Sequence, residues 1–395
     1  MAFLDTESFY RNSCQAGFVK LDAVARNIGW TTPTVWGTVE ITINLSKPEK
    51  DPRDIAAAAN AKASGERGYI DPATGRVRAC PLCVEDADVE CGYAQPIRIG
   101  GEKWGLWYSP YAYYDQHCIA MSWEHRRMHV DRRAFECLFD AVDVLPGYFF
   151  GSNADLPIVG GSILAHDHFQ GGKHVFPMQK APLCDTFDLA GFSDVEAGVV
   201  KWPLSVIRLV GPSRDRLVDA ACVVLDAWCS HDDAQAGIVS GFACDGVACI
   251  GGVLGGEVIA ESSQQAAFDQ VGKRAFSDGR AKGHNTITPI LCKDGDVYQL
   301  DLALRCNITS EEHPLGVFHP HENLHHIKKE NIGLIEVMGL AILPPRVQQV
   351  MAERGLSQDD VGNLFAKVLE DAGVFKWDAA GRQALRRFIG KLSQG

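Results

Sequence analysis

Two histidines and a glutamine occupy alternate positions in the segment PIVGGSILAHDHFQGG, residues 157–172. If this segment is a strand, His166, His168 and Gln170 share one face, because successive side chains of a strand point to opposite sides. A neutral imidazole there can attack a phosphorus atom, and the backbone N–H groups of residues 160–162 can bind phosphate oxygens. This arrangement predicts phosphoryl or nucleotidyl transfer, although the same spacing also suits two metal ligands or a polar edge.

The sequence HDHFQ, residues 166–170, resembles the His-x-His-x-Gln signature of the histidine-triad transferases, in particular the galactose-1-phosphate uridylyltransferase family. Longer segments at residues 40–58, 151–172 and 319–344 look like the second, Gram-positive type of that family. Because these segments lie far apart, the resemblance covers most of the chain. It implies an enzyme of galactose metabolism that transfers UMP from UDP-glucose to galactose 1-phosphate. Members of this type often carry additional N-terminal sequence, so we expect this chain to be short at that end.

The resemblance assigns the covalent step to His168, the second histidine of the signature. A histidine pKa of about 6.5 leaves most of the imidazole neutral at cytoplasmic pH. His168 would attack the α-phosphorus of UDP-glucose and expel glucose 1-phosphate, and galactose 1-phosphate would then accept the uridylyl group in a ping-pong exchange. Gln170 would donate its amide N–H to a nonbridging phosphate oxygen. Related hydrolases end the signature with histidine, so within this superfamily the glutamine favours transfer over hydrolysis.

Further substrate contacts are expected around the phosphate turn and on a later strand. Asn153 would bind a ribose hydroxyl or cap the loop that precedes the turn. The N–H of Gly161 and, by the resemblance, Ser162 would donate to the phosphate. Arg305 offers a planar donor that stays charged, and it is the predicted phosphate ligand within residues 302–312. An internal salt bridge with a carboxylate would explain Arg305 equally well.

A second group of histidines stands near the C-terminus and runs into a pair of lysines: His319, His321, His325, His326, Lys328 and Lys329. Relatives of the first family type bind iron near an equivalent region. Their alternate-histidine motif is replaced here by an adjacent pair, so we do not expect iron. The two lysines would bind the sugar phosphate, unless the segment is a solvated basic loop.

Cys80 and Cys83 form a Cys-x-x-Cys pair, which supplies only two of the four ligands of a tetrahedral zinc site. By analogy with metal-binding relatives, the resemblance implies that His125 and His166 complete a structural zinc site. Such a site would hold the catalytic strand without taking part in the chemistry. Two alternatives stay open, because Cys91 could replace one ligand or the cysteines could be buried thiols.

The composition is that of an ordinary soluble enzyme. The chain has 395 residues, 46% of them hydrophobic, which suffices for a large core and suggests two or three domains. The acidic start lacks the features of a secretion signal, and no run of about eighteen apolar residues could span a membrane. We therefore expect a cytoplasmic protein. The odd number of cysteines, 13, favours free thiols, and a formal net charge of −12 argues against general nucleic-acid binding.

The pattern of hydrophobic residues indicates a mixed α+β protein. Strand-forming residues predict strands over residues 40–45, 103–111 and 116–123. Helical spacing predicts helices over residues 52–64 and 131–145, the latter starting at an aspartate N-cap.

A change of composition after residue 182 suggests a domain boundary near residue 190. The resemblance implies two histidine-triad-like halves, each an antiparallel sheet with packed helices. Residues 1–190 would form the half that carries the HDHFQ strand, and residues 191–395 would form the second half.

Two other functions are compatible with the sequence. A nucleotide phosphorylase or hydrolase would use the same His168 but pass the nucleotidyl group to inorganic phosphate or water. A non-catalytic, zinc-stabilised protein would bind nucleotide sugars without turnover. Relatives of the first type build their site across a dimer, so the resemblance implies a homodimer, although no apolar stripe identifies its interface.

Overall fold

A computed structural model of the chain describes these residues: 4–45, 69–70, 77–160, 163–241 and 283–394. The helix predicted over residues 52–64 and the phosphate-turn residues Gly161 and Ser162 lie outside the described residues. The predicted strands at residues 40–45, 103–111 and 116–123 are present, as β2 Gly37–Ile43, β6 Glu102–Tyr108 and β7 Cys118–Ser122.

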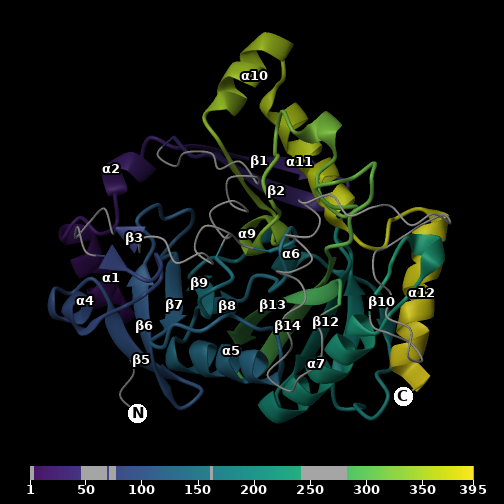
Figure 1. Ribbon diagram of the computed structural model, residues 1–395, viewed down its shortest axis with the longest axis horizontal. Helices are drawn as coiled ribbons and strands as arrows, with labels where there is room; N and C mark the ends of the chain where they lie inside the picture. The colour runs from purple at the N-terminus through teal and green to yellow at the C-terminus, as the bar shows by residue number, and fades with distance from the viewer. Residues whose placement is uncertain (1–3, 46–68, 71–76, 161–162, 242–282, 395) are drawn as a thin grey trace.

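A ten-stranded antiparallel sheet forms the centre of the molecule (Figure 1). Its strands follow the order β10-β11-β12-β14-β13-β8-β9-β7-β6-β5. Their bounds are β5 Gln95–Ile99, β6 Glu102–Tyr108, β7 Cys118–Ser122, β8 Phe149–Gly151, β9 His168–Gly172, β10 Leu183–Phe187, β11 Glu196–Val200, β12 Val206–Gly211, β13 Asn285–Asp294 and β14 Val297–Cys306. Every neighbouring pair is antiparallel, which agrees with the predicted α+β class.

The large sheet consists of two halves that meet between β8 and β13. Residues 95–172 supply β5 to β9, and residues 183–306 supply β10 to β14. The halves are joined by two cross-strand pairs, Gly151 with Ile290 and Phe150 with Leu291. Residue 190 falls between β10 and β11, two strands that pair with each other in the second half.

Two long helices, α5 Arg132–Val144 and α7 Arg214–Cys229, cover one face of the sheet and contact each other (Figure 1). The helix α5 begins where the sequence predicts, because the Asp131 side chain accepts a hydrogen bond from the N–H of Ala134 at 3.0 Å. Its apolar side chains recur at helical spacing and are buried against the sheet. They include Phe135, Leu138, Phe139 and Val142.

A three-stranded sheet lies over the opposite face, above the large sheet in Figure 1. Strands β1 Ile28–Thr34 and β2 Gly37–Ile43 pair antiparallel, and β15 Leu340–Leu343 runs parallel to β2. With α11 Gln358–Ala372, this small sheet encloses a second core that includes Trp202.

Alternate residues of the central strands contribute to the two cores, as the two-residue period of a strand requires. Phe150 packs in the core under α5 and α7, whereas Phe149 packs in the core under the small sheet. In β9, Phe169 belongs to the first core. The neighbouring side chains His168 and Gln170 therefore point toward the side of the small sheet.

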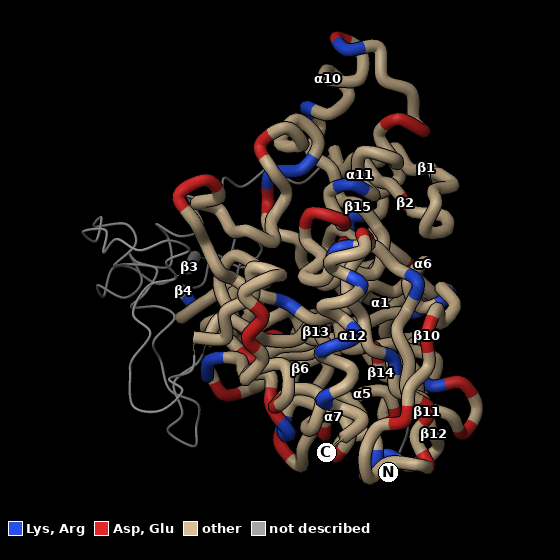
Figure 2. The backbone as a smooth tube through the Cα atoms, turned by 90° about the vertical axis from the view of Figure 1, so that its right-hand side faces the viewer, with Lys and Arg blue, Asp and Glu red and all other residues tan. Residues whose placement is uncertain are grey.

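The remaining elements complete the fold. They are α1 Thr6–Gln15, α2 Leu21–Val24, β3 Tyr69–Ile70, β4 Val77–Arg78, α4 Asp86–Glu90, α6 Pro177–Lys180, η1 Ala234–Ala236, η2 Glu322–Leu324, α9 Leu334–Val337, α10 Arg346–Arg354 and α12 Ala379–Gln394. Basic and acidic residues are interspersed along the chain and do not separate onto two sides (Figure 2). In the described part of the chain, no helix has the length and apolar character that crossing a membrane requires.

Candidate functional site

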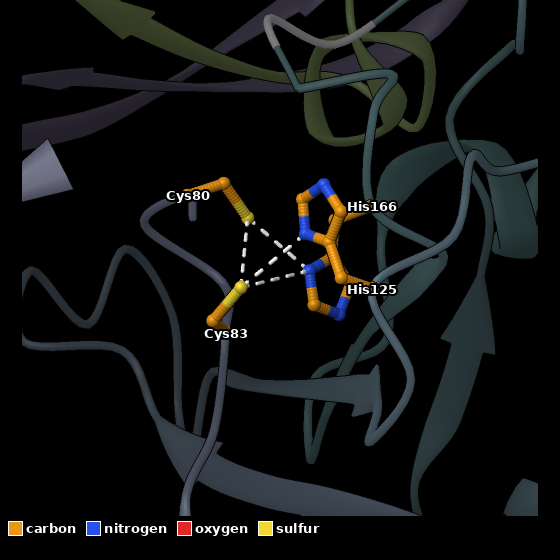
Figure 3. Close-up of side chains that lie close together, drawn as sticks. All are labelled: Cys80, Cys83, His125 and His166. Carbon is orange, nitrogen blue, oxygen red and sulfur yellow. Dashed lines mark hydrogen bonds between the residues drawn. The ribbon is translucent and has the colours of Figure 1, made fainter. Parts of the chain in front are cut away.

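Two cysteines and two histidines from distant parts of the chain converge beside the first half of the sheet (Figure 3). The ligand atoms of Cys80, Cys83, His125 and His166 all lie within 4.8 Å of one another. The two Sγ atoms are 3.7 Å apart. Cys80 Sγ is 3.2 Å from Nδ1 of His166, and Cys83 Sγ is 3.3 Å from Nδ1 of His125. Cys91 is not part of this group, and its thiol donates to a backbone carbonyl at 3.4 Å.

This group has the donor set and the spacing of a tetrahedral metal site. An ion that binds thiolates at about 2.3 Å and imidazole at about 2.0 Å holds neighbouring ligand atoms roughly 3.5 to 3.8 Å apart. His166 Nε2 lies 2.8 Å from the carbonyl oxygen of Ser122, so Nε2 carries the proton and Nδ1 presents its lone pair to the sulfurs. Hydrogen bonding with the Cys80 thiol lowers the pKa of Cys83 well below its ordinary value, which favours a thiolate at this position.

The loop that carries the cysteines is anchored by a buried ion pair. Arg78, which ends β4, donates to Asp88 in α4 through two contacts of 2.6 and 3.0 Å. The same guanidinium donates to the carbonyl oxygen of Cys83 at 2.6 Å. Leu82 and Val84, on either side of Cys83, are buried in a small apolar cluster. The two sulfurs are thus held in place by packing and hydrogen bonds on both sides.

His168 begins β9 and is buried. Its Nδ1 lies 2.7 Å from the carbonyl oxygen of His166, so Nδ1 carries the proton and Nε2 keeps its lone pair. Burial lowers the pKa of His168 below its ordinary value, because an imidazolium would lose its hydration. His168 is therefore a neutral imidazole with a basic Nε2 at neutral pH.

The structure corrects one detail of the predicted strand. The strand starts at His168, and His166 lies in the turn before it. Only His168 and Gln170 therefore share a strand face. Before the strand, the His166 ring faces Cys80 and Cys83, and its carbonyl oxygen accepts from Nδ1 of His168 instead of from a neighbouring strand.

Asp167, between the two histidines, is held by two arginines. Its Oδ2 accepts from Arg126 at 3.2 Å and from Arg133 at 3.1 Å, and both arginines also bind Glu102. Its backbone N–H donates to the carbonyl of Arg126 at 2.7 Å, and its own carbonyl accepts from Ser122 at 2.9 Å. These contacts fix the main chain next to the His166 carbonyl, which orients the His168 ring.

Gln170 lies two residues along β9 from His168, on the same side of the strand. Its Oε1 is 3.3 Å from Nε2 of His117. Phe169, between them, points to the other side and stacks on Trp104 with ring centroids 5.2 Å apart. The strand therefore places an imidazole and an amide side by side above a rigid aromatic core.

Asn153 and Arg305 both hold the segment that leads into α9. The Oδ1 of Asn153 accepts from the N–H of Leu334 at 2.8 Å. Arg305 is buried in β14 and donates to the carbonyl of Ile332 at 3.0 Å, and burial lowers its pKa to about 10. Asn153 therefore makes a capping contact, and the Arg305 guanidinium donates to a backbone carbonyl.

Lys328 is buried between two carboxylates. Its Nζ lies 2.8 Å from Glu336 and 3.2 Å from Glu330. Burial alone would lower the pKa of Lys328, but the two carboxylates outweigh burial and raise it. The solvated basic loop considered from sequence is wrong for Lys328, because its side chain is only 2% exposed. Lys329 is half-buried.

The C-terminal histidines do not form a group of metal ligands among the described residues. His319 Nδ1 and His325 Nε2 lie 3.2 and 2.9 Å from the same carbonyl oxygen, that of Pro320. The His321 ring stacks on His313 at a centroid distance of 4.5 Å. Burial lowers the pKa of His319 to about 4. Among the residues described, the Cys80 group is the one set of three or more side chains placed to share a metal ion.

Sequence reasoning did not identify His117 or Asp167 as site residues. His117 stands two residues before Ile119, which pairs with Gln170 across β7 and β9. Residues at such diagonal positions share a sheet face, so only the strand register reveals the contact. Asp167 lies inside the recognised motif, but its arginine partners depend on tertiary structure.

Two family models match the chain. The model described as galactose-1-phosphate uridyl transferase, N-terminal domain, matches residues 2–127. The model described as galactose-1-phosphate uridyl transferase, C-terminal domain, matches residues 141–358. Together they cover most of the sequence.

Curated relatives match along nearly the whole chain. A galactose-1-phosphate uridylyltransferase of Streptococcus pneumoniae is 41% identical, over 97% of this chain and 77% of its own length. The proteins of that name in Pediococcus pentosaceus and Bacillus subtilis are 42% and 39% identical, each over 98% of this chain and over 79% and 76% of their own lengths. Among solved structures, yeast Ap4A phosphorylase Apa2 is 12% identical with a TM-score of 0.45, covering 93% of this chain and 92% of that one.

Proposed function

Because the chain belongs to the galactose-1-phosphate uridylyltransferase family, we propose that it transfers UMP from UDP-glucose to galactose 1-phosphate through a covalent intermediate on His168. The family matches confirm the predicted family, and with it a nucleotidyltransferase of galactose metabolism. The nucleophile and the order of events are the proposal, and the hydrogen bond from His168 Nδ1 to the His166 carbonyl carries it.

In the first half-reaction, the Nε2 lone pair of His168 attacks the α-phosphorus of UDP-glucose. The P–N bond forms as the bond from that phosphorus to the bridging oxygen breaks, and the electron pair leaves with glucose 1-phosphate. The imidazole gains positive charge, so its Nδ1–H bond to the His166 carbonyl becomes charge-assisted and stronger. Burial disfavours that charge and keeps the intermediate reactive.

In the second half-reaction, a phosphate oxygen of galactose 1-phosphate attacks the same phosphorus. The P–N bond breaks, its electron pair returns to Nε2, and UDP-galactose leaves. No proton needs to move in either step, so a single neutral imidazole suffices as the catalytic group. Gln170, on the same face of β9, would donate its amide N–H to a nonbridging oxygen as charge develops there.

The Cys80 group would hold zinc as a structural ion. Two thiolates and two imidazoles are the ligands that structural zinc prefers. The bound ion would fix the His166 ring, and with it the carbonyl that sets the tautomer of His168. Zinc would therefore organise the nucleophile without contacting the substrate.

Among the other predicted ligands, some would contact the substrate directly, and others would hold neighbouring residues in place. Gly161 and Ser162 remain the predicted donors to the phosphate. Asn153 and Arg305 would act by holding residues 332–334. Lys328 would fix Glu336 beside the sugar site, and Lys329 remains the predicted contact to the sugar phosphate.

The test is the intact mass of the purified protein after mixing with UDP-glucose alone and then with galactose 1-phosphate. We expect a uridylyl adduct that galactose 1-phosphate discharges as UDP-galactose, and no adduct for His168→Asn. Steady release of UMP without UDP-galactose would instead indicate the hydrolase, and binding without turnover the nucleotide-sugar binding protein. Sedimentation of the same sample tests the predicted homodimer.

A further inference from the structure

We propose that His117 is a positioning residue that turns the amide of Gln170 so that its NH2 group, and not its carbonyl oxygen, meets the phosphate. This inference rests on the proposed function, because it refines the part that Gln170 takes in the transfer. An amide looks nearly symmetrical in shape, but its two ends have opposite hydrogen-bonding character. A nonbridging phosphate oxygen needs the NH2 end, and the carbonyl end would repel it.

The contact between the two side chains selects one end of the amide. His117 Nε2 lies 3.3 Å from Oε1 of Gln170. Since Oε1 can only accept, the imidazole N–H must donate in this contact. The carbonyl end is thereby occupied by His117, which leaves the NH2 end for the phosphate side of β9.

The His117 ring is itself held in a fixed plane. It is 3% exposed, stacks on Tyr113 with a centroid distance of 5.3 Å and packs at a tilt against Tyr114 with a centroid distance of 4.5 Å. Its carbonyl accepts from the N–H of Ser109 at 2.7 Å, and its N–H donates to the carbonyl of Tyr114 at 3.3 Å. A buried ring that is held by two tyrosine rings and by its own backbone can impose its orientation on a flexible neighbour.

The loop over residues 109–117 is also tied to the strand that it orients. The Tyr114 hydroxyl donates to the carbonyl of Gly171, the residue after Gln170, at 3.2 Å. Two non-glycine residues of this loop, Ala112 and Gln116, have positive φ angles of 37° and 49°. Such conformations are unfavourable and persist where the surrounding structure imposes them. The loop is therefore built to a specific shape against β9.

The test is a double-mutant cycle on the rate of adduct formation in a single turnover with UDP-glucose, for the wild type, His117→Phe, Gln170→Ala and the double variant. Phenylalanine keeps the stacking ring and removes the donor. We expect Gln170→Ala to slow the step about a hundredfold. We expect His117→Phe to slow the step about tenfold when Gln170 is present. In the Gln170→Ala background, we expect it to slow the step less than about twofold.

The cycle separates positioning from a merely structural role. An equal loss from His117→Phe in both backgrounds would overturn the proposal. His174→Phe is the matched control, because His174 also lies against Tyr114, at 5.9 Å, but bonds to Glu40 instead of Gln170. Its effect should be the same with and without the amide.

A conservative variant guards against misfolding. His117→Gln keeps an N–H donor, and we expect it to retain more of the wild-type rate than His117→Phe. If His117→Phe unfolds early in a thermal melt, His117→Gln and His117→Ala take its place in the cycle. If the wild type forms no adduct, the proposed function fails and this inference fails with it; if it forms the adduct without coupling, only this inference fails.

Discussion

Residues 166–170 and residues 319–329 both group histidines with other polar side chains, yet they are organised in opposite ways. In the first region, His166 directs Nδ1 at two sulfurs from a separate loop, and its carbonyl orients His168. In the second, His319 and His325 both meet the carbonyl of Pro320. The first arrangement leaves lone pairs pointing at a common centre, whereas the second uses the rings as donors to the backbone.

The difference comes from the chemical groups that lie next to each histidine ring. The Cys-x-x-Cys loop brings thiols within 4.8 Å of two rings, and soft anionic sulfur makes the unprotonated imidazole nitrogen the useful one. Around His319 and His325 the neighbours are carbonyls, which require the protonated nitrogen. Spacing in the sequence therefore reports ligand-type residues, but the partner segment decides whether they become ligands.

The largest expected effect comes from His125→Gln. The His125 ring is exposed, so its packing contributes little, and a large loss of stability would come from a metal ion held by the Cys80 group. We expect loss of the bound ion and of more than about 4 kcal/mol of unfolding free energy, since metal binding is coupled to folding. Metal analysis and urea unfolding measure both. Full metal content with an unchanged midpoint would contradict the structural role of the group.

Lys328→Ala should rank next. It would leave Glu336 and Glu330 without the ammonium that lies 2.8 and 3.2 Å from them, and breaking a buried pair costs about 3 to 5 kcal/mol. Urea unfolding measures the loss. The double variant with Glu336→Gln is the control, because removing that carboxylate should recover part of the stability. A loss below about 1 kcal/mol would mean that the lysine is solvated.

Acid should weaken the second region through His319. Burial lowers the pKa of His319 to about 4, whereas an unfolded histidine titrates at about 6.5. The unfolded state therefore binds the proton first, and the unfolding free energy falls as pH drops from about 6.5 to about 4, by about 3 kcal/mol in total. His319→Gln should remove that part of the pH dependence in unfolding curves recorded across this range. Identical slopes for the variant and the wild type would refute it.

His325→Gln should have the smallest effect. It removes one donor to the Pro320 carbonyl at 2.9 Å, worth about 1 kcal/mol. The bound metal should stay in place, in contrast to the same substitution at His125. If the two substitutions had equal effects on metal content, the comparison between the regions would collapse.

Local sequence patterns predicted helices and strands well where a residue type has a direct effect on the backbone. Asp131 caps α5 as expected, because a short carboxylate before a helix satisfies a backbone N–H. The spacing of apolar residues correctly predicted the same helix, and strand-forming residues correctly predicted strands at β2, β6 and β7. Cys80 and Cys83 stood out by their Cys-x-x-Cys spacing, whereas His125 and His166 were assigned to the group by the family resemblance.

Side-chain partners that are brought together only by tertiary structure could not be predicted. The carboxylates of Glu330 and Glu336 are close to Lys328 in sequence, but only the turn at α9 directs them at its ammonium group. Likewise, the contact between His117 and Gln170 requires the register of β7 with β9. Such pairs depend on tertiary structure, which local composition does not report.

The narrow junction between β8 and β13 has a consequence for biosynthesis. The first half of the large sheet leaves the ribosome with one side of β8 still unpaired, because β13 is translated only after α7. Open strand edges promote association between nascent chains. A charged side chain cannot protect this edge at Gly151, since a Cβ there would lie 2.7 Å from Leu334 in the finished fold. A chain that ends before β13 would thus leave one edge of β8 without its partner strand.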